Sequence, residues 1–273
     1  MKILLKIDTF GSRIKMRSFS LGLILGIFVN LFGLFIIPGV ADAKGFEPMA
    51  EALMAMKSSE SVRVERIPMP KWGVASSYFL FSPEKVVPKK GFLFYPGAQV
   101  DTRSYAPLMR EIALAGFKVA LINMPFGIST LGAYRASDVM RQIGSVKTWI
   151  IGGHSLGGVS AGSFSEWRES QVGGLVLWAA YTSKWVDLSS LEIPVLSIFG
   201  DQDGLSTVED IEENKSYLPD HTSYVKIKGG NHTWFGSYGD GTPQDGDNPS
   251  TISRFEQQKR VVEETLHFLT RSH

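Results

Sequence analysis

The stretch TWIIGGHSLGGVSAG, residues 148–162, decides the fold class of this chain. It contains two consecutive G-x-S-x-G patterns, centred on Ser155 and Ser160. The apolar run before Ser155 predicts a buried strand, and the residues after it predict a helix. A serine on the sharp turn between such a strand and helix is typical of a nucleophile elbow. Ser160 lies inside the predicted helix, where no sharp turn fits, so we interpret it as a small residue at a helix–sheet contact.

Three glycines around Ser155 fit the same interpretation. Side chains at Gly153 and Gly157 would collide across a tight turn. Gly158 lets the helix approach the sheet closely. The N-terminus of that helix would point its free N–H groups at the serine. The stretch therefore favours a reactive serine at 155 over one that only caps a turn.

Strand and helix patterns alternate along the chain from residue 62 onward. This alternation predicts an α/β fold, with a doubly wound, mostly parallel sheet flanked by helices and with sites at the carboxyl ends of the strands. In the last helix, Ile252, Phe255, Val261 or Val262, Leu266 and Leu269 are expected to trace the buried face. The expected strands are 62–69, 76–83, 91–97, 117–125, 147–153, 173–180, 192–200 and 222–230, and the expected helices are 46–59, 105–116, 135–143, 159–170, 208–219 and 252–271.

A serine nucleophile needs a base, and the chain has five histidines. Four are poorly placed: His154 shares the turn with the serine, His221 precedes the last strand, and His267 and His273 lie at the end of the chain. His232 follows the last predicted strand at its carboxyl end, so we expect it to be the base.

The base needs an acid to orient it, and Asp201 and Asp203 follow another predicted strand. We favour Asp203 because it lies deeper in the loop and has more reach toward His232. Asp201 emerges first from the strand and fits a turn-forming role.

The chain order Ser155, Asp203, His232 is the nucleophile–acid–base order of α/β-hydrolases. The segments FLFYPGAQVD (92–101), GGHSLGG (152–158), IFGDQDG (198–204) and GGNHTWFG (229–236) resemble the motifs of that superfamily, particularly its compact, lidless, dienelactone-hydrolase-like members. The resemblance covers most of residues 62–270. It implies the fold and the catalytic machinery of a serine hydrolase, and it says almost nothing about the substrate.

An oxyanion hole requires two N–H donors aimed at the developing negative charge. One donor is expected to be the backbone N–H of Leu156, directly after the nucleophile. The second is expected from the loop after the strand 91–97, with Ala98 first and Gln99 second. Superfamily members often have His-Gly in this loop where this chain has Pro96-Gly97, which leaves open how the loop is braced.

Two loops bear on the substrate pocket. The twelve residues 181–192 are too short for a helical lid, so we expect an open pocket with walls that could include Phe126, Tyr181, Trp185 and Trp234. The glycine-rich, acidic loop 236–250 could border the active site, could bind a cation through Asp240, Asp245 and Asp247, or could simply be solvated.

Bulk composition excludes several classes of function. The net charge of +1 offers no case for nucleic-acid binding. The absence of cysteine excludes disulfides, thiolate metal sites and a cysteine nucleophile. No dinucleotide fingerprint is present, and we expect no cofactor and no metal.

Residues 1–43 read as a segment apart from the body. Basic residues up to Arg17 precede an uncharged run that ends in Ala41-Asp42-Ala43, which is the layout of a signal peptide cleaved after Ala43. The run is also long enough for an uncleaved membrane anchor. Both readings place the body, 44–273, outside the cytoplasm as a single α/β domain.

These observations predict an exported serine hydrolase that cleaves a carboxylic ester or thioester through an acyl-enzyme on Ser155. The expected partner is a small ester-type molecule, and membrane contact is expected only if the N-terminal segment stays uncleaved. A non-catalytic scaffold on the same fold, an acyltransferase with the same triad and a cofactor-free haloperoxidase-like enzyme are the alternatives. The sequence predicts neither the acyl group nor the oligomeric state.

Overall fold

The computed structural model describes residues 46–73 and 76–272. The signal peptide or anchor expected at 1–43 lies outside the described residues. Among the residues that are described, no helix is long and apolar enough to cross a membrane.

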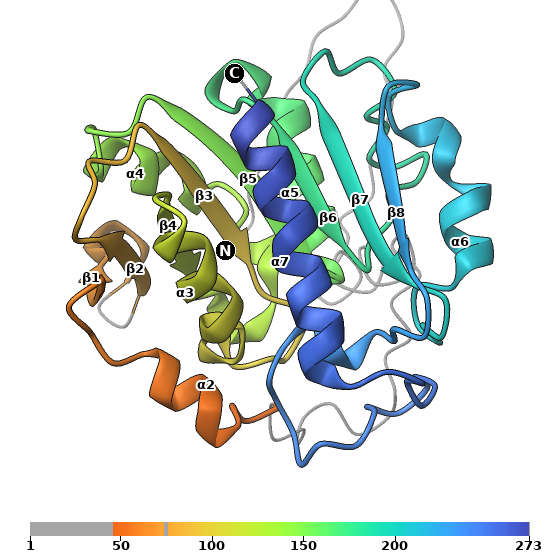
Figure 1. Ribbon diagram of the computed structural model, residues 1–273. Helices are drawn as coiled ribbons and strands as arrows, with labels where there is room; N and C mark the ends of the chain where they lie inside the picture. Colours follow the sequence, from red (N-terminus) through yellow and green to blue (C-terminus); the bar gives the residue numbers. More distant parts are fainter. Residues whose placement is uncertain (1–45, 74–75, 273) are drawn as a thin grey trace, which may run out of the picture. The chain divides into compact units, whose positions relative to one another are not determined.

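One eight-stranded sheet organises the described chain, in the order β1-β2-β4-β3-β5-β6-β7-β8 (Figure 1). The first two strands run antiparallel to their neighbours, and the six from β4 to β8 are mutually parallel. The predicted mostly parallel, doubly wound sheet is therefore confirmed. The strands are β1 (Val62–Pro68), β2 (Ser77–Pro83), β3 (Lys90–Tyr95), β4 (Lys118–Ile122), β5 (Thr148–His154), β6 (Leu175–Trp178), β7 (Val195–Gly200) and β8 (Ser223–Ile227).

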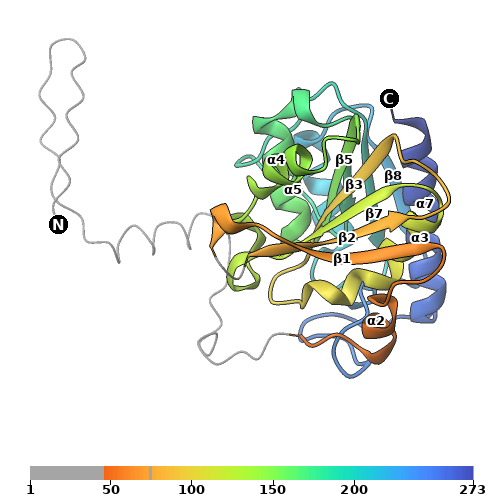
Figure 2. The same ribbon diagram turned by 90° about the vertical axis from the view of Figure 1, so that its left-hand side faces the viewer.

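Helices cover both faces of the sheet, with α4 and α5 on one side and α3 and α7 on the other (Figure 2). The α-helices are α2 (Ala50–Ala55), α3 (Ala106–Leu114), α4 (Arg135–Gln142), α5 (Leu156–Trp167), α6 (Val208–Glu213) and α7 (Arg254–Arg271). Short 3-10 helices are η2 (Pro70–Trp72), η3 (Thr102–Tyr105), η4 (Pro125–Gly127), η5 (Ser129–Leu131), η6 (Glu169–Gln171), η7 (Lys215–Tyr217) and η8 (Thr233–Phe235).

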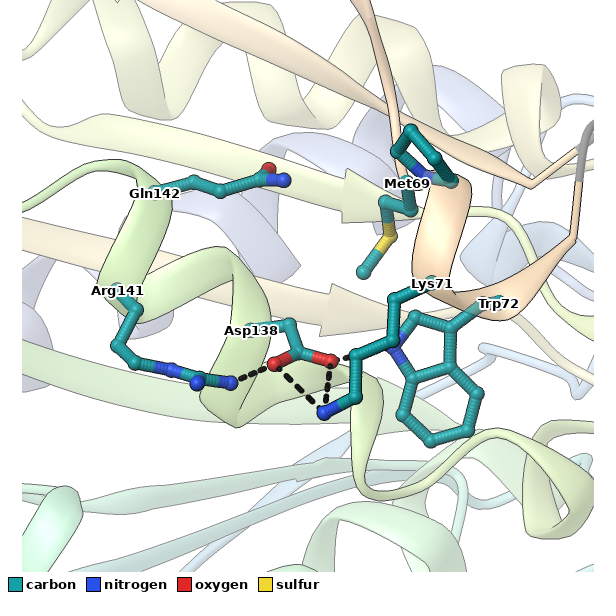
Figure 3. A pocket seen from close by; sticks show the side chains of 7 residues that line it. Met69, Lys71, Trp72, Asp138, Arg141 and Gln142 are labelled. Atoms are coloured by element: carbon teal, nitrogen blue, oxygen red, sulfur yellow. Dashed lines mark hydrogen bonds and ion pairs between the residues drawn. The ribbon is translucent and has the colours of Figure 1, made fainter.

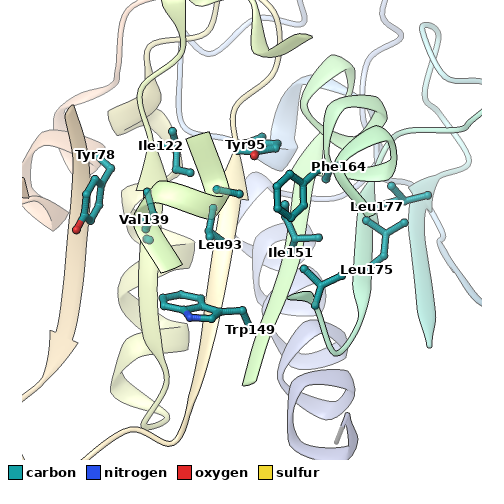
Figure 4. Packing of buried hydrophobic residues seen from close by; sticks show 14 of the residues in the cluster. Tyr78, Leu93, Tyr95, Ile122, Val139, Trp149, Ile151, Phe164, Leu175 and Leu177 are labelled. Atoms are coloured by element: carbon teal, nitrogen blue, oxygen red, sulfur yellow. The ribbon is translucent and has the colours of Figure 1, made fainter. Parts of the chain in front are cut away.

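The central strands are buried on both faces because their side chains alternate between two cores. In β3, Leu93 and Tyr95 pack toward α4 and α5, whereas Phe92 and Phe94 pack toward α3 and α7. Figure 4 shows the first of these cores, in which Leu93 and its neighbours meet Phe164 of α5. A rigid core on each side holds the carboxyl ends of the strands in register, and the site is built there.

The expected buried face of the last helix is wrong at one position. Phe255 is 75% exposed, and the buried side chains of α7 are Gln257, Val261, Thr265 and Leu269. Two of these are polar and have partners inside the protein. Gln257 hydrogen-bonds the backbone of Asn231, and Thr265 accepts from Trp178 Nε1 at 3.2 Å. The buried face of α7 therefore combines apolar packing with two tertiary hydrogen bonds that hydrophobicity alone does not indicate.

Candidate active site

Ser155 stands on the sharp turn between β5 and α5, with φ 54° and ψ −125°. A non-glycine residue in this region costs about 1–3 kcal/mol and persists only where its surroundings enforce it. Its N–H donates to Trp178 O at 2.9 Å. A Cβ atom on Gly153 would lie 2.3 Å from the backbone of Gly157, so the turn closes only with glycine at this position. Gly158 likewise sits against Ala180, where a Cβ would lie 2.5 Å from the alanine Cβ.

Ser160 lies inside α5 and is fully buried. Its Oγ donates to Leu156 O at 2.9 Å and lies 2.9 Å from Ser129 Oγ. Both contacts hold the Ser160 hydroxyl inside the protein, which fits the interpretation of the second G-x-S-x-G pattern as a packing contact.

Asp203 and His232 form a buried pair. Oδ2 of Asp203 lies 2.9 Å from Nδ1 of His232, and Oδ1 lies 3.1 Å from it. The same Oδ1 accepts the backbone N–H groups of Leu205 at 2.8 Å and Ser206 at 2.6 Å, which fixes the carboxylate in its loop. Because a carboxylate only accepts, Nδ1 of the imidazole must donate, and its Nε2 is left with a lone pair.

Asp201 has a different role. Its Oδ1 accepts the N–H of Gly229 at 2.6 Å and the side-chain amide of Gln202 at 3.2 Å. These bonds tie the loop after β7 to the loop after β8. Of the two aspartates, the structure brings Asp203 onto His232 and leaves Asp201 as a turn residue.

The elbow at Ser155 lies beside the loop that carries His232, residues 231–238, which is called the histidine loop. The ring of His154, the residue before the serine, lies 4.6 Å from the ring of His232, centroid to centroid. Ser155 Oγ and His232 Nε2 make no hydrogen bond with any residue that the structure describes. The structure thus joins acid to base directly and brings the base beside the elbow.

The backbone N–H groups of Leu156 and Ala98, both near Ser155, have no acceptor within the described part of the chain. Gln99, the second choice for an oxyanion donor, uses its N–H on Gly127 O at 2.9 Å. The free donor in this loop is therefore the one on Ala98.

The loop after β3 lies directly against the elbow. A Cβ on Gly157 would fall 2.2 Å from Tyr95 O and 2.5 Å from Pro96 O. Only glycine allows this contact, which places the two free N–H groups on adjoining segments of backbone.

A model of the alpha/beta hydrolase family matches residues 91–259, which span the elbow, the acid and the base. The chain belongs to the alpha/beta hydrolase family. It is therefore a hydrolase enzyme, and the recognition made on its motifs is confirmed.

Solved structures share the fold of this hydrolase at low sequence identity. A predicted CIB-like hydrolase from Thermoplasma acidophilum is 14% identical, with a TM-score of 0.58 over 77% of this chain and 98% of its own. Est1E from Butyrivibrio proteoclasticus is 12% identical, with a TM-score of 0.56 over 76% and 99%. A thermophilic esterase from Thermogutta terrifontis, with malate bound, is 14% identical, with a TM-score of 0.54 over 77% and 98%. A search of curated proteins finds no match.

The loop after β3, residues 96–101, is called the oxyanion loop after its expected role, and it is braced by Tyr105, which the sequence did not single out. The Tyr105 hydroxyl accepts the N–H of Gly97 at 3.0 Å and lies 2.8 Å from Nδ1 of His154. Since the hydroxyl already accepts from Gly97, its own proton is available for His154. Burial, and after it the electrostatic interaction with the neighbouring His232, hold the pKa of His154 well below its usual 6.5, so the ring stays neutral.

A second brace comes from the segment that precedes α2. Phe46 donates its N–H to Gln99 O at 2.8 Å and accepts the N–H of Asp101 at 3.0 Å. Gln99 itself has φ 59°. No local pattern marks Phe46 for this contact, because its partners lie more than fifty positions away along the chain.

A groove of about 760 Å³ opens beside the oxyanion loop of the hydrolase. Phe126, which is 85% exposed, lines it together with Gln99 and Val100. Tyr181, Trp185 and Trp234, the other expected wall residues, do not line this groove. Residues 179–194 between β6 and β7, all described, contain no helix, in keeping with the expected lack of a large lid.

A smaller pocket of about 300 Å³ lies between η2 and α4 (Figure 3). Asp138 occupies its centre and accepts from Trp72 Nε1 at 2.5 Å, while Lys71 and Arg141 both pair with its carboxylate. Both cationic side chains of this pocket are therefore already paired with Asp138.

The acidic loop 236–250 does not gather its carboxylates. Asp240 bonds Thr242, Asp247 bonds backbone N–H groups, and the side chain of Asp245 is exposed. Within residues 46–73 and 76–272, no group of three or more histidine, aspartate or glutamate side chains could hold a metal ion.

Proposed function

We propose that this hydrolase cleaves carboxylic esters or thioesters through an acyl-enzyme on Ser155. The observation that carries the proposal is a strained, half-buried serine beside a buried Asp203–His232 pair and two free backbone N–H groups. Strain of this kind is stored at functional sites and has no evident structural use here. The solved structure of a thermophilic esterase with the same fold is consistent with this substrate class.

In the proposed reaction, Ser155 Oγ attacks the carbonyl carbon and its proton passes to Nε2 of His232. Asp203 holds the ring through Nδ1–H and stabilises the imidazolium. The carbonyl oxygen becomes negative within reach of the Leu156 and Ala98 N–H groups, each of which is worth about 3 kcal/mol by analogy with other oxyanion donors. The C–O or C–S bond then breaks, and the leaving alcohol or thiol takes the proton from His232.

The second half of the reaction repeats these steps with water. His232 removes a proton from water as the oxygen attacks the acyl-enzyme, and the same two N–H groups receive the negative charge. Collapse of this intermediate releases the acid and returns the proton to Ser155. An acyltransferase would use the same acyl-enzyme with a different acceptor.

The test compares Ser155→Ala with wild type on p-nitrophenyl esters of increasing chain length. Loss of the nucleophile should lower kcat by at least about 10³-fold and abolish labelling by a fluorophosphonate probe. Ser160→Ala is the matched control because it removes a serine from the neighbouring G-x-S-x-G pattern, and it should keep both activity and labelling. Equal hydrolysis by wild type and Ser155→Ala would refute the proposal and favour a scaffold.

We also propose that the body acts outside the cytoplasm, on the strength of the basic and apolar pattern of residues 1–43. N-terminal sequencing of protein recovered from cell fractions tests this. A mature chain that begins at Lys44 supports cleavage, and a full-length chain in the membrane fraction supports an anchor. A full-length chain in the soluble cytoplasmic fraction contradicts export.

A further inference from the structure

Asp247 lies in the acidic loop 236–250. Its carboxylate accepts backbone N–H groups from the loop that carries Asp203 and from the loop that carries His232. Its Oδ1 accepts the N–H of Gly204 at 3.1 Å and the N–H of His232 at 3.2 Å. Gly204 directly follows Asp203 in the chain. A single carboxylate oxygen therefore connects the neighbour of the acid to the base itself.

The other oxygen of Asp247 holds the histidine loop a second time. Oδ2 accepts the N–H of Thr233 at 2.8 Å and its hydroxyl at 2.6 Å. Oδ1 also accepts the N–H of Asn248 at 2.9 Å. All of these donors point at one carboxylate, and bonds of this type to a charged acceptor are about twice as strong as neutral ones.

The acidic loop packs tightly against the loop that carries the acid. A Cβ on Gly204 would fall 2.3 Å from Gly246 O and 3.1 Å from Asp247 Cα. The absence of a side chain at 204 lets the two backbones approach to this distance. Residues 244–248 therefore pack directly against the loop that carries Asp203, and this part of the acidic loop is not simply solvated.

We propose that Asp247 is a positioning residue that sets the separation of Asp203 and His232. The inference rests on the proposed function, because it assigns the pair a catalytic task. The carboxylate acts only through its neighbours and does not touch the reacting atoms. It is surrounded by N–H and O–H donors, an environment that suits an anion and opposes a cation.

An amide at this position cannot replace the carboxylate. Asparagine has one acceptor oxygen, and its NH₂ group would face N–H donors in place of the second oxygen. In Asp247→Asn, either the Gly204 and His232 donors or the two Thr233 donors lose their acceptor. The imidazole of His232 is then free to move relative to Asp203.

The test measures Asp247→Asn in three ways. On p-nitrophenyl acetate, kcat should fall by about 10²-fold with KM within about threefold, since a misplacement near 1 Å costs this much. In proton NMR spectra, the low-field Nδ1–H resonance of His232 should broaden or vanish through faster exchange. Thermal unfolding reports whether the variant is folded at the assay temperature.

Asp245→Asn is the matched control. Asp245 lies in the same loop, two positions away, and its exposed side chain makes no hydrogen bond or ion pair with any residue the structure describes. The control should keep the kcat and the His232 resonance of wild type. A folded Asp247→Asn protein that also keeps both would overturn the proposal.

If Asp247→Asn does not fold, Thr233→Val takes its place. This change removes the hydroxyl donor to Oδ2 and also the acceptor of the Gln244 N–H. Both bonds hold the acidic loop to the histidine loop, so kcat should fall several-fold and the His232 resonance should broaden. An unchanged kcat and resonance would overturn the proposal. The NMR measurement does not depend on esterase activity, so a failure of the proposed function, with Ser155→Ala as active as wild type, is distinguished from a failure of this inference.

Discussion

The elbow around Ser155 and the loop around His232 are held in place by different means. The residues that shape the elbow, Gly153 and Gly157, lie two positions on either side of the serine. His232 is held by Asp203, 29 positions earlier, and by Asp247, 15 positions later. The glycines that allow the elbow to form are therefore close to the serine in the chain, although Gly157 also packs against Tyr95 and Pro96. The side chains that hold the histidine loop come from distant positions.

The two regions also differ in where backbone strain is found. The elbow concentrates backbone strain in one residue with a positive φ. The histidine loop has no such residue from Asn231 to Tyr238, and its backbone N–H groups from Asn231 to Trp234 donate to side-chain acceptors. A motif can reveal the first arrangement, whereas only coordinates reveal the second. The predictions that follow perturb one region at a time.

The largest effect is expected at the elbow, from Gly157→Ala. The new methyl group would fall 2.2 and 2.5 Å from two backbone oxygens that have no room to move away. The free energy of unfolding should drop by about 4 kcal/mol or more, within the range of severe overpacking. Urea unfolding measures this free energy. Gly144→Ala is the control, because a Cβ at Gly144 would lie 3.8 Å from its nearest neighbour, Arg141 O. Similar stability in the two variants would show that the elbow relaxes more easily than its geometry indicates.

An intermediate effect is expected where the two regions touch, at His154. The folded protein keeps this buried ring neutral, because burial and the nearby His232 lower its pKa. Below about pH 6.5 the unfolded chain binds one more proton at this residue, so acidification favours unfolding by up to about 1.4 kcal/mol per pH unit. Unfolding free energies from pH 7.5 to 5, measured for wild type and His154→Phe, should diverge, with the shallower decline in the variant.

His221→Gln is the control for this pH dependence, because His221 is exposed on the loop before β8. Its profile should follow that of wild type. A His154→Phe profile parallel to wild type throughout would show that His154 does not contribute to acid sensitivity.

The smallest effect is expected from the strain of the elbow itself. Ser155→Gly should be more stable than Ser155→Ala by about 1 kcal/mol, because glycine adopts φ 54° without the cost of a Cβ. Both variants lack the hydroxyl, so the comparison isolates the backbone. Chemical denaturation of the pair gives the difference. Equal stability, or a less stable glycine variant, would mean that the unfolded-state entropy of glycine outweighs the relief of strain.

The fold was predictable because hydrophobic alternation repeats along the chain. Each expected strand from 62–69 to 222–230 overlaps an observed strand, and the apolar run in KTWIIGG does become β5 before the elbow. The prediction failed at Phe255, which is exposed, because buried Gln257 satisfies the backbone of Asn231 across 26 positions. The hydrophobic pattern of the helix does not indicate such a distant partner.

The candidate site was predictable in part for the same reason. Residues that follow parallel strands meet at one edge of the sheet, so Asp203 could be expected beside His232 and is found there. Tyr105, Phe46 and Asp247 carry no motif. Each makes a hydrogen bond to a distant segment, and such contacts form only once the sheet is assembled.

By itself, the sequence determined the α/β architecture, the turn at Ser155 and the order of the three polar residues, because periodicity and glycine spacing act over a few neighbouring positions. Tertiary structure alone decided which backbone N–H after β3 is free, how Tyr105 braces that loop and how Asp247 connects the loops of Asp203 and His232. Those features depend on hydrogen bonds between segments up to 49 positions apart, and the chain closes such loops only through the packing of its core.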